Sequence, residues 1–129
     1  MNLETQNPQA LVEAYREAFD RKDVDACVRF FADDAVLKFL FGTFQGRKHI
    51  EDWHRDRFAA EVQILRVDDL TVEGNRVVLN AIVTSRKLKR FRMDEVKGTG
   101  IFEIHDGRFR EVQLGPRRGV ASHLDWHFR

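Results

Sequence analysis

The chain lacks the features that mark several large classes of protein. Its 129 residues include one cysteine, and no apolar run approaches the roughly 18 residues that a membrane-spanning helix needs. A single cysteine excludes an internal disulfide and a cysteine-based zinc site. The N-terminal residues also lack the basic-then-apolar order of a secretory signal. We therefore expect a cytoplasmic protein with no membrane partner.

The chain also lacks an excess of charge of either sign, whereas aromatic residues are abundant. The 22 basic and 21 acidic residues leave a formal net charge of +1, so we expect no nucleic-acid partner. The chain holds 11 Phe, two Trp and one Tyr. So many rings need a core or a ring-lined cavity, because on the surface they would promote aggregation.

Helical periodicity runs through three segments of the first half of the chain. In the first segment apolar residues recur at i, i+3, i+4, i+7 and i+8. Asp23 can cap the second, whose apolar stripe ends at Phe31 and includes Cys27 as a buried structural thiol. We expect helices over residues 8–21, 24–31 and 47–60.

The remaining sequence favours strands. One is expected between the second and third helices, followed by a short turn that Gly42 and Gly46 flank, and beyond residue 60 the apolar period becomes two. Helices and then strands predict an α+β fold, in which a curved antiparallel sheet wraps over three N-terminal helices to form a cone. We expect a single domain with its core over 8–116 and a tail at 117–129, and strands at 35–41, 61–72, 76–87, 93–105 and 108–115.

Two of these strands are apolar on both faces. Ile101 and Phe102 are adjacent in one, and the strand over 76–87 leaves open whether Ile82 and Thr84 or Leu79 and Ala81 point inward. In a sheet with one face exposed to solvent, apolar and polar residues would alternate more regularly along each strand. We therefore expect a second subunit to cover the outer face in a homodimer. Light scattering that shows a monomer at micromolar concentration would exclude this.

A series of short motifs carries a family resemblance. They stand here as YREAFD at 15–20, DVDA at 23–26, FADDAV at 31–36, FG at 41–42, GRKHI at 46–50, GIFEI at 100–104 and DGR at 106–108. Their order resembles the nuclear transport factor 2-like superfamily, in particular its SnoaL-like polyketide cyclase and ketosteroid isomerase-like branches. The resemblance implies the cone-shaped, cystatin-like fold. Fold alone does not imply function.

The resemblance also implies which functional residues of the family are present. The oxyanion-binding tyrosine falls on Tyr15, and a supporting tyrosine falls on His54. The isomerase general base falls on Phe39, and the second oxyanion acid falls near Gly100. Phenylalanine cannot accept a proton and glycine has no side chain, so ketosteroid isomerisation by that mechanism is excluded.

Other branches of the superfamily also lose their catalytic groups here. Limonene epoxide hydrolase-like and cyclase-type members need an acid near Arg117. The positions of the two scytalone dehydratase-like histidines are apolar in this chain. The resemblance therefore predicts the fold and leaves the reaction open.

Two polar residues lie on the apolar stripe of the helix over 47–60, namely His54 and Arg57. In a structural interpretation His54 bonds a backbone carbonyl, and Arg57 pairs with Asp94 or Glu61. In a functional interpretation His54 lines a pocket with Tyr15 as an acid–base group. The sequence leaves both open.

Further polar groups have alternative interpretations. Asp94 either points inward as a replacement base or pairs with a neighbouring arginine in solvent. Gly98 and Gly100 either leave room for a ligand or bend their strand. The basic run 86–92 is typical of a solvated hairpin end, although it could bind an anion or RNA. The spacing of His123, Asp125 and His127 could suit a metal, but without a helix or strand around them a C-terminal tail that packs its rings is favoured, so we expect no metal and no cofactor.

These observations favour a protein that binds a small hydrophobic molecule, either ring-containing or carbonyl-bearing. If it is an enzyme, Tyr15, His54 and Asp94 would perform cofactor-free isomerisation, cyclisation or dehydration by proton transfer. The alternative is a non-catalytic ligand carrier or oligomerising accessory module. The ligand-binding residues are expected to be Phe19, Phe31, Phe39, Phe41, Trp53, Arg57, Phe58, Gly100, Phe102, Val112 and Leu114.

Overall fold

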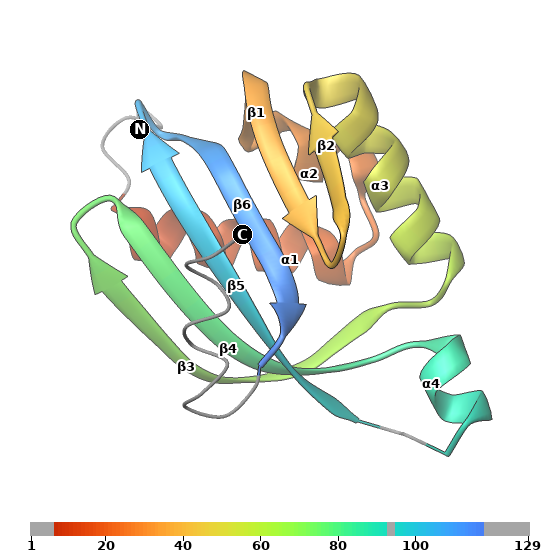
Figure 1. Cartoon of the computed structure of the whole chain (residues 1–129). Coiled ribbons are helices and arrows are strands. Elements are labelled where there is room, and N and C mark those ends of the chain that lie inside the picture. Colours follow the sequence, from red (N-terminus) through yellow and green to blue (C-terminus); the bar gives the residue numbers. More distant parts are fainter. Residues whose placement is uncertain (1–6, 93–94, 118–129) are drawn as a thin grey trace.

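The computed structural model describes residues 7–92 and 95–117, in which a curved six-stranded sheet packs on helices (Figure 1). The fold is α+β, as the sequence predicts. In chain order the elements are α1 (Pro8–Asp20), α2 (Val24–Arg29), β1 (Phe31–Phe39), β2 (Gly42–Gln45), α3 (Arg47–Ala59), β3 (Gln63–Glu73), β4 (Arg76–Thr84), α4 (Arg86–Arg90), β5 (Val96–His105) and β6 (Arg108–Pro116).

The strand order in the sheet is β2-β1-β6-β5-β4-β3. The predicted antiparallel meander is confirmed for β3 to β6. The expectation of a wholly antiparallel sheet is wrong, because β1 pairs with β6 in parallel. This pairing joins the helical half of the chain to the meander. Figure 1 shows α1 behind the sheet and α3 beside β2.

The three helix predictions are confirmed to within two residues at every end. Asn7 caps α1 by accepting a hydrogen bond of 2.7 Å from the Ala10 amide, and Asp23 caps α2 in the same way through the Ala26 amide. α3 begins after Gly46, whose φ of +86° favours glycine. Within the described residues, no helix is long and apolar enough to span a membrane.

Three local predictions are wrong. Phe31 does not end a helix but begins β1, where it pairs with Phe109 of β6. The segment from Gly42 forms the short strand β2, because it can pair with β1 across a tight turn. The strand over 76–87 ends at Thr84, because Ser85 accepts from the Leu88 amide and caps the short helix α4.

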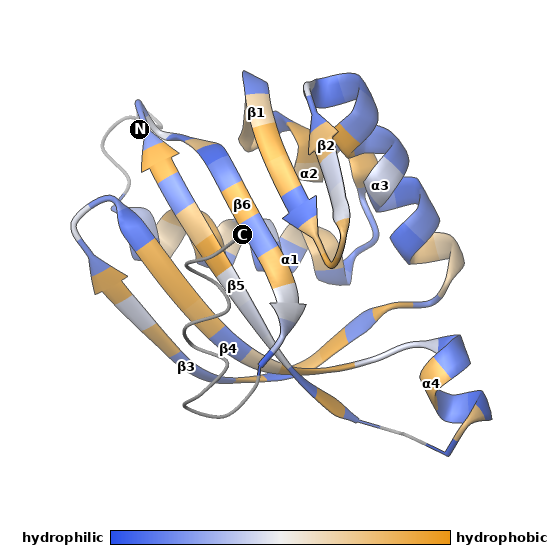
Figure 2. Ribbon diagram, in the orientation of Figure 1, coloured by the Kyte–Doolittle hydropathy of each residue, from blue (hydrophilic) through white to orange (hydrophobic). Residues whose placement is uncertain are grey.

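The hydrophobic core lies between the helices and the inner face of the sheet. Val77 pairs with Phe102, and Leu79 pairs with Gly100, which places Val77 and Leu79 of β4 in the core. The open alternatives for this strand are not exclusive, because Ala81, Ile82 and Thr84 are buried as well. Figure 2 shows alternating hydrophobic and hydrophilic bands along β6, whereas β4 is hydrophobic over most of its length. The fully buried side chains include Cys27, Phe31, Leu37, Ile50, His54, Val77, Phe102, Phe109 and Val112.

Phe41 is not part of the core or of any inner wall, which corrects the sequence prediction. β1 ends at Phe39, and Leu40 then takes a positive φ of 54° that turns the chain toward β2. The turn breaks the alternation of the strand. As a result the side chain of Phe41 is 99% exposed.

Candidate functional site

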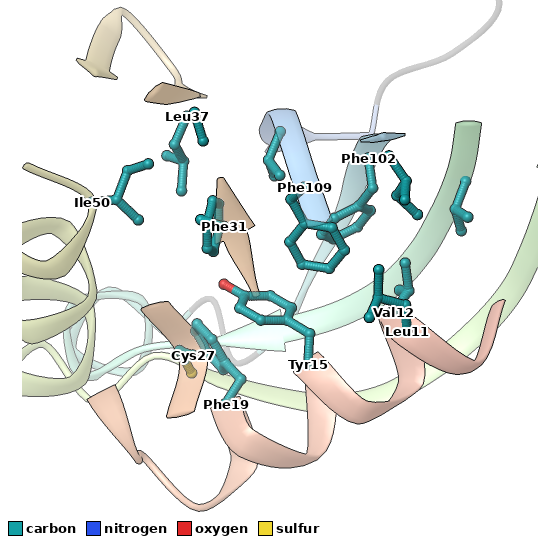
Figure 3. Close-up of a cluster of buried hydrophobic side chains, with 14 of the residues drawn as sticks. Leu11, Val12, Tyr15, Phe19, Cys27, Phe31, Leu37, Ile50, Phe102 and Phe109 are labelled. Atoms are coloured by element: carbon teal, nitrogen blue, oxygen red, sulfur yellow. The ribbon is translucent and has the colours of Figure 1, made fainter. Parts of the chain in front are cut away.

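Tyr15 and His54 are in direct contact at the centre of the core. Tyr15 comes from the buried face of α1 and His54 from that of α3, and Tyr15 Oη lies 2.7 Å from His54 Nε2. Tyr15 is 4% exposed and His54 is fully buried. Figure 3 shows the Tyr15 ring pointing from α1 into the cluster of core phenylalanines. The sequence prediction that the two groups face the same interior is therefore correct.

The hydrogen bonds of this pair fix where its protons are. His54 Nδ1 lies 2.8 Å from the carbonyl oxygen of Ile50, which is an acceptor only, so Nδ1 carries the proton and donates. Nε2 is then unprotonated and accepts from the Tyr15 hydroxyl. The structural interpretation of His54, a bond to a backbone carbonyl, matches this arrangement.

Burial keeps both groups neutral. Desolvation raises the pKa of Tyr15 well above 10, with a smaller contribution from the nearby Cys27 thiol. Desolvation also lowers the pKa of His54 from 6.5 to about 4, against the bond to the Ile50 carbonyl, which raises it. At neutral pH the pair is thus an uncharged phenol that donates to an uncharged imidazole.

Aromatic rings enclose the pair. The Tyr15 ring has ring-centroid distances of 5.3 Å to Phe109, 5.7 Å to Phe31 and 6.0 Å to Phe102. Phe31, Phe102 and Val112, which the sequence assigned to ligand binding, are between 0% and 1% exposed and belong to the core cluster. The expectation of an open hollow that Tyr15 and His54 share is not supported by this packing.

The space that Gly100 could leave for a ligand is also filled. A Cβ atom added to Gly100 would lie 2.9 Å from Cε1 of Phe102 and 3.0 Å from Cδ2 of Leu114. These two side chains occupy the space that the missing side chain leaves. Glycine at this position therefore allows close packing and leaves no room for a ligand.

A second cluster lies at the margin of the core, where β1 meets α3. The Cζ atom of Arg57 lies 5.0 Å from the Phe39 ring centroid and 5.9 Å from the Trp53 ring. The rings of Phe39 and Trp53 meet edge to face at 5.5 Å. Phe39, Phe58 and Leu114 are only partly buried although they pack on the core. The ring of Phe58 contacts Phe19 instead, at 4.8 Å. We call Phe39, Trp53, Arg57 and Leu114, which pairs with Phe39, the margin cluster.

The predicted ion pair between Arg57 and Glu61 is wrong. Glu61 instead pairs with Arg86 at 3.3 Å, and the Arg57 guanidinium lies over aromatic rings. The alternative partner and candidate base, Asp94, lies outside the described residues. The structure therefore brings together two of the predicted catalytic residues, Tyr15 and His54.

Two hydrogen-bond donors of the margin cluster have no acceptor. Nε1 of Trp53 and Nε of Arg57 are both buried and without a hydrogen-bond partner. Such atoms are rare in native structures, and each needs an explanation. Helical spacing predicts that both residues lie on the inner stripe of α3, but a pattern of residue types does not show whether their donors are paired.

A separate surface groove of about 260 Å³ lies between the end of α1 and the start of β3. Phe19, a predicted ligand-binding residue, borders it but is 6% exposed. Both polar and apolar side chains line the groove, namely Phe19, Asp20, Lys22, Val62, Gln63, Ile64 and Leu65. It offers little enclosure for a hydrophobic ligand.

The other candidates that lie within the described residues form no catalytic, metal or small-molecule site. Cys27 is fully buried, and burial raises its pKa to about 12, so the thiol is inert at neutral pH. No group of three potential metal ligands gathers within residues 7–92 and 95–117. His123, Asp125 and His127 lie outside the described residues. The basic run 86–92 has its cations exposed on and beside α4.

The family follows from the sequence as well as from the fold. The model of the SnoaL-like domain matches residues 12–112. The chain belongs to the SnoaL-like domain family. The comparison with curated proteins gave no match.

Solved structures of other proteins share this fold. A candidate polyketide cyclase from Sinorhizobium meliloti has a TM-score of 0.73 and 27% identity, and the match covers 88% of this chain and 99% of that one. A candidate polyketide cyclase from Xanthomonas campestris has a TM-score of 0.73 and 24% identity over 95% of this chain and 96% of that one. A candidate ketosteroid isomerase from Kribbella flavida has a TM-score of 0.73 and 15% identity over 87% of this chain and 78% of that one.

Proposed function

We propose that the protein binds a small hydrophobic molecule, ring-containing or carbonyl-bearing, at the margin cluster. The observation that supports this is the partly buried ring of Phe39, which meets Trp53 edge to face at 5.5 Å and leaves apolar surface available beside a packed core. Ligand sites are mostly apolar walls with a few polar groups that fix orientation. The likeness to candidate polyketide cyclases favours a ligand with fused rings or ketone groups.

Binding without catalysis is the form of this function that the geometry favours. The Tyr15 hydroxyl donates to His54, and His54 donates to Ile50, so neither has a free proton to give. Phe39 also stands where the isomerase base would be. Proton transfer by Tyr15, His54 and Asp94 stays a prediction, and a carrier or accessory role is the alternative.

The test is a thermal-shift and native mass screen against ring-containing ketones and aromatic compounds. A ligand at about 100 times its Kd is expected to raise the free energy of unfolding by about 2.7 kcal/mol. Phe39→Ala is expected to weaken binding, whereas the matched change Phe41→Ala on the fully exposed neighbour should leave it unchanged. No stabilisation by any compound, or equal loss in both variants, would reject the proposal.

Incubation of the bound compound with the protein, followed by NMR of the compound, separates the two forms of the function. Conversion of the compound that depends on Tyr15 or His54 would establish catalysis and contradict the carrier form. The homodimer and the cytoplasmic location expected from the sequence stay predictions. Support for the homodimer comes from the outer face of the sheet, where the half-buried apolar residues Val78 and Ile101 pair with each other.

A further inference from the structure

We propose that one end of the molecule docks on the surface of an anionic lipid bilayer. Exposed apolar side chains at this end enter the interface of the bilayer, and cations beside them bind the lipid phosphates. The contact is peripheral, because within the described residues no helix is long and apolar enough to span a bilayer. This docking does not depend on the small-molecule binding proposed above.

The exposed apolar side chains of the described residues gather at one end of the sheet. Five large hydrophobic side chains are exposed, and one of them, Val72, lies at the opposite end, beside the β3–β4 turn. The other four are Leu40, Phe41, Leu65 and Phe91. Apolar surface gathered in this way marks a site of interaction with a partner or a membrane.

Strand pairing places the segments that carry these four residues at the same end. Phe39, just before the β1–β2 turn, pairs with Leu114 near the end of β6. Gly98, near the start of β5, pairs with Pro116 at the end of β6, and β3 begins beside the end of β4. The β1–β2 turn, the start of β3 and the α4 segment between β4 and β5 therefore lie at one end of the sheet, which we call the α4 end. Figure 1 shows α4 standing apart from the other helices at this end.

The β1–β2 turn presents two apolar side chains to solvent in a strained conformation. Leu40 has a φ of +54°, which a bulky residue rarely adopts. It is 54% exposed, and the next residue, Phe41, is 99% exposed. Glycine would adopt this φ at no cost and would expose no apolar surface. Two apolar side chains at such a position are expected when a partner covers them, since strain of this kind gathers at functional sites.

Cations lie beside the apolar side chains of the α4 end. Residues 86–92 hold five cations and no acid. Arg86 pairs with Glu61 at 3.3 Å, whereas the other four cations are exposed and form no ion pair within residues 7–92 and 95–117, namely Lys87, Lys89, Arg90 and Arg92. Phe91 lies among them and is 64% exposed. Exposed rings among cations are typical of segments that lie in the interface of anionic membranes.

This combination fits a bilayer better than it fits other partners. Nucleic acid stacks on aromatic rings and has no comparable contact for the aliphatic Leu40 and Leu65. A second copy docked through the same end would place two basic runs against each other. A bilayer accepts aliphatic and aromatic side chains alike and presents phosphates to cations. The expectation of no membrane partner came from the lack of a spanning segment and of excess charge, and a local basic and apolar surface requires neither.

The test is co-sedimentation of the full chain with vesicles of phosphatidylcholine alone and with vesicles of equal parts phosphatidylcholine and phosphatidylglycerol. We expect binding to the mixed vesicles and little to phosphatidylcholine alone, because an anionic surface attracts each cation. Salt at about 1 M shortens the Debye length to roughly 3 Å and should release most of the bound protein. No binding to the mixed vesicles, equal binding to both kinds, or binding that salt leaves unchanged would overturn the proposal.

Paired charge variants at the two ends of the sheet locate the contact. The double change Lys87→Gln and Lys89→Gln should weaken binding roughly 25-fold, because each cation at an anionic surface contributes about fivefold. The matched control is the double change Arg110→Gln and Arg108→Gln, which removes two exposed cations near the β5–β6 turn at the opposite end. The control should bind nearly as the parent does, and an equal loss in both pairs would show that the α4 end is not the contact.

Apolar variants test whether side chains enter the bilayer. Phe91→Thr should weaken binding about 10-fold, because its exposed ring then gains nothing by leaving water. Val72→Thr, on the exposed apolar residue of the opposite end, should leave binding nearly unchanged. Thermal unfolding verifies that each variant folds, and for one that does not, the comparison of the two kinds of vesicle decides. The proposal is wrong if Phe91→Thr leaves vesicle binding unchanged, or if it instead abolishes binding to a single-stranded RNA or dissociates a dimer seen by light scattering.

Discussion

Replacing Phe109 by alanine is expected to lower the free energy of unfolding by about 3–5 kcal/mol. Phe109 is fully buried, and its ring centroid lies 5.0 Å from Phe102 and 5.3 Å from both Tyr15 and Phe31. It also pairs with Phe31 where β6 meets β1 in parallel. The change leaves a cavity surrounded by rings that cannot all move in to fill it. Equilibrium unfolding in urea, followed by circular dichroism, measures the loss.

Phe41→Ala is the matched control, since it makes the same change in composition on a side chain that is 99% exposed. It should alter the free energy of unfolding by no more than about 0.5 kcal/mol. A loss below about 1 kcal/mol for Phe109→Ala would contradict the tight ring packing of the core. A large loss for Phe41→Ala would show that the ring at the β1–β2 turn is buried in solution, as it would be at an interface between subunits.

Sequence periodicity predicted the helices because their signals are local. The buried stripe of α1 and the side-chain caps Asn7 and Asp23 depend on residues within one or two turns. The same holds for the meander, whose turns at Gly74 and Gly107 use the positive φ that glycine adopts readily. These parts of the fold could be read without knowledge of the rest of the chain.

Other parts depend on partners far away in the sequence. The spacing of Phe31 fits the apolar stripe of α2, but its pairing with Phe109 makes it a strand residue. β2 has four residues and exists because β1 lies beside it. Neither a parallel pairing with a distant strand nor so short an edge strand leaves a periodic signal.

In the candidate site, too, the features that depend on local spacing could be predicted and those that depend on distant packing could not. Alternation and helical spacing correctly pointed Tyr15 and His54 toward one interior, where their 2.7 Å contact joins α1 to α3. Whether that interior is open depends on the summed volumes of the surrounding rings, and a pattern of residue types does not give this sum. The prediction that Phe41 binds the ligand is wrong for a local reason, because the positive φ of Leu40 ends the alternation one residue before it.

The second large expected effect is a loss of stability in acid, caused by the buried imidazole of His54. The pKa of His54 is about 4 in the native state and 6.5 when exposed, so between these values the unfolded chain binds a proton that the native chain does not. The contribution of His54 to the free energy of unfolding is fully present above about pH 6.5 and decreases as the pH falls toward 4. The expected loss is about 2 kcal/mol by about pH 5. Unfolding in urea at a series of pH values measures it.

The pH range of this loss distinguishes His54 from the two aspartates whose pKa values are lowered. Asp52 and Asp68 have pKa values lowered below 3.8 by their hydrogen bonds to Lys48 and Arg117, so they act at lower pH. His54→Gln should flatten the curve between about pH 6.5 and 4.5, because no imidazole remains to be protonated on unfolding. His105→Gln, on an exposed histidine, should leave the slope as it is. An equally steep curve in His54→Gln would mean that the imidazole titrates normally, which a water-filled space beside Tyr15 would explain.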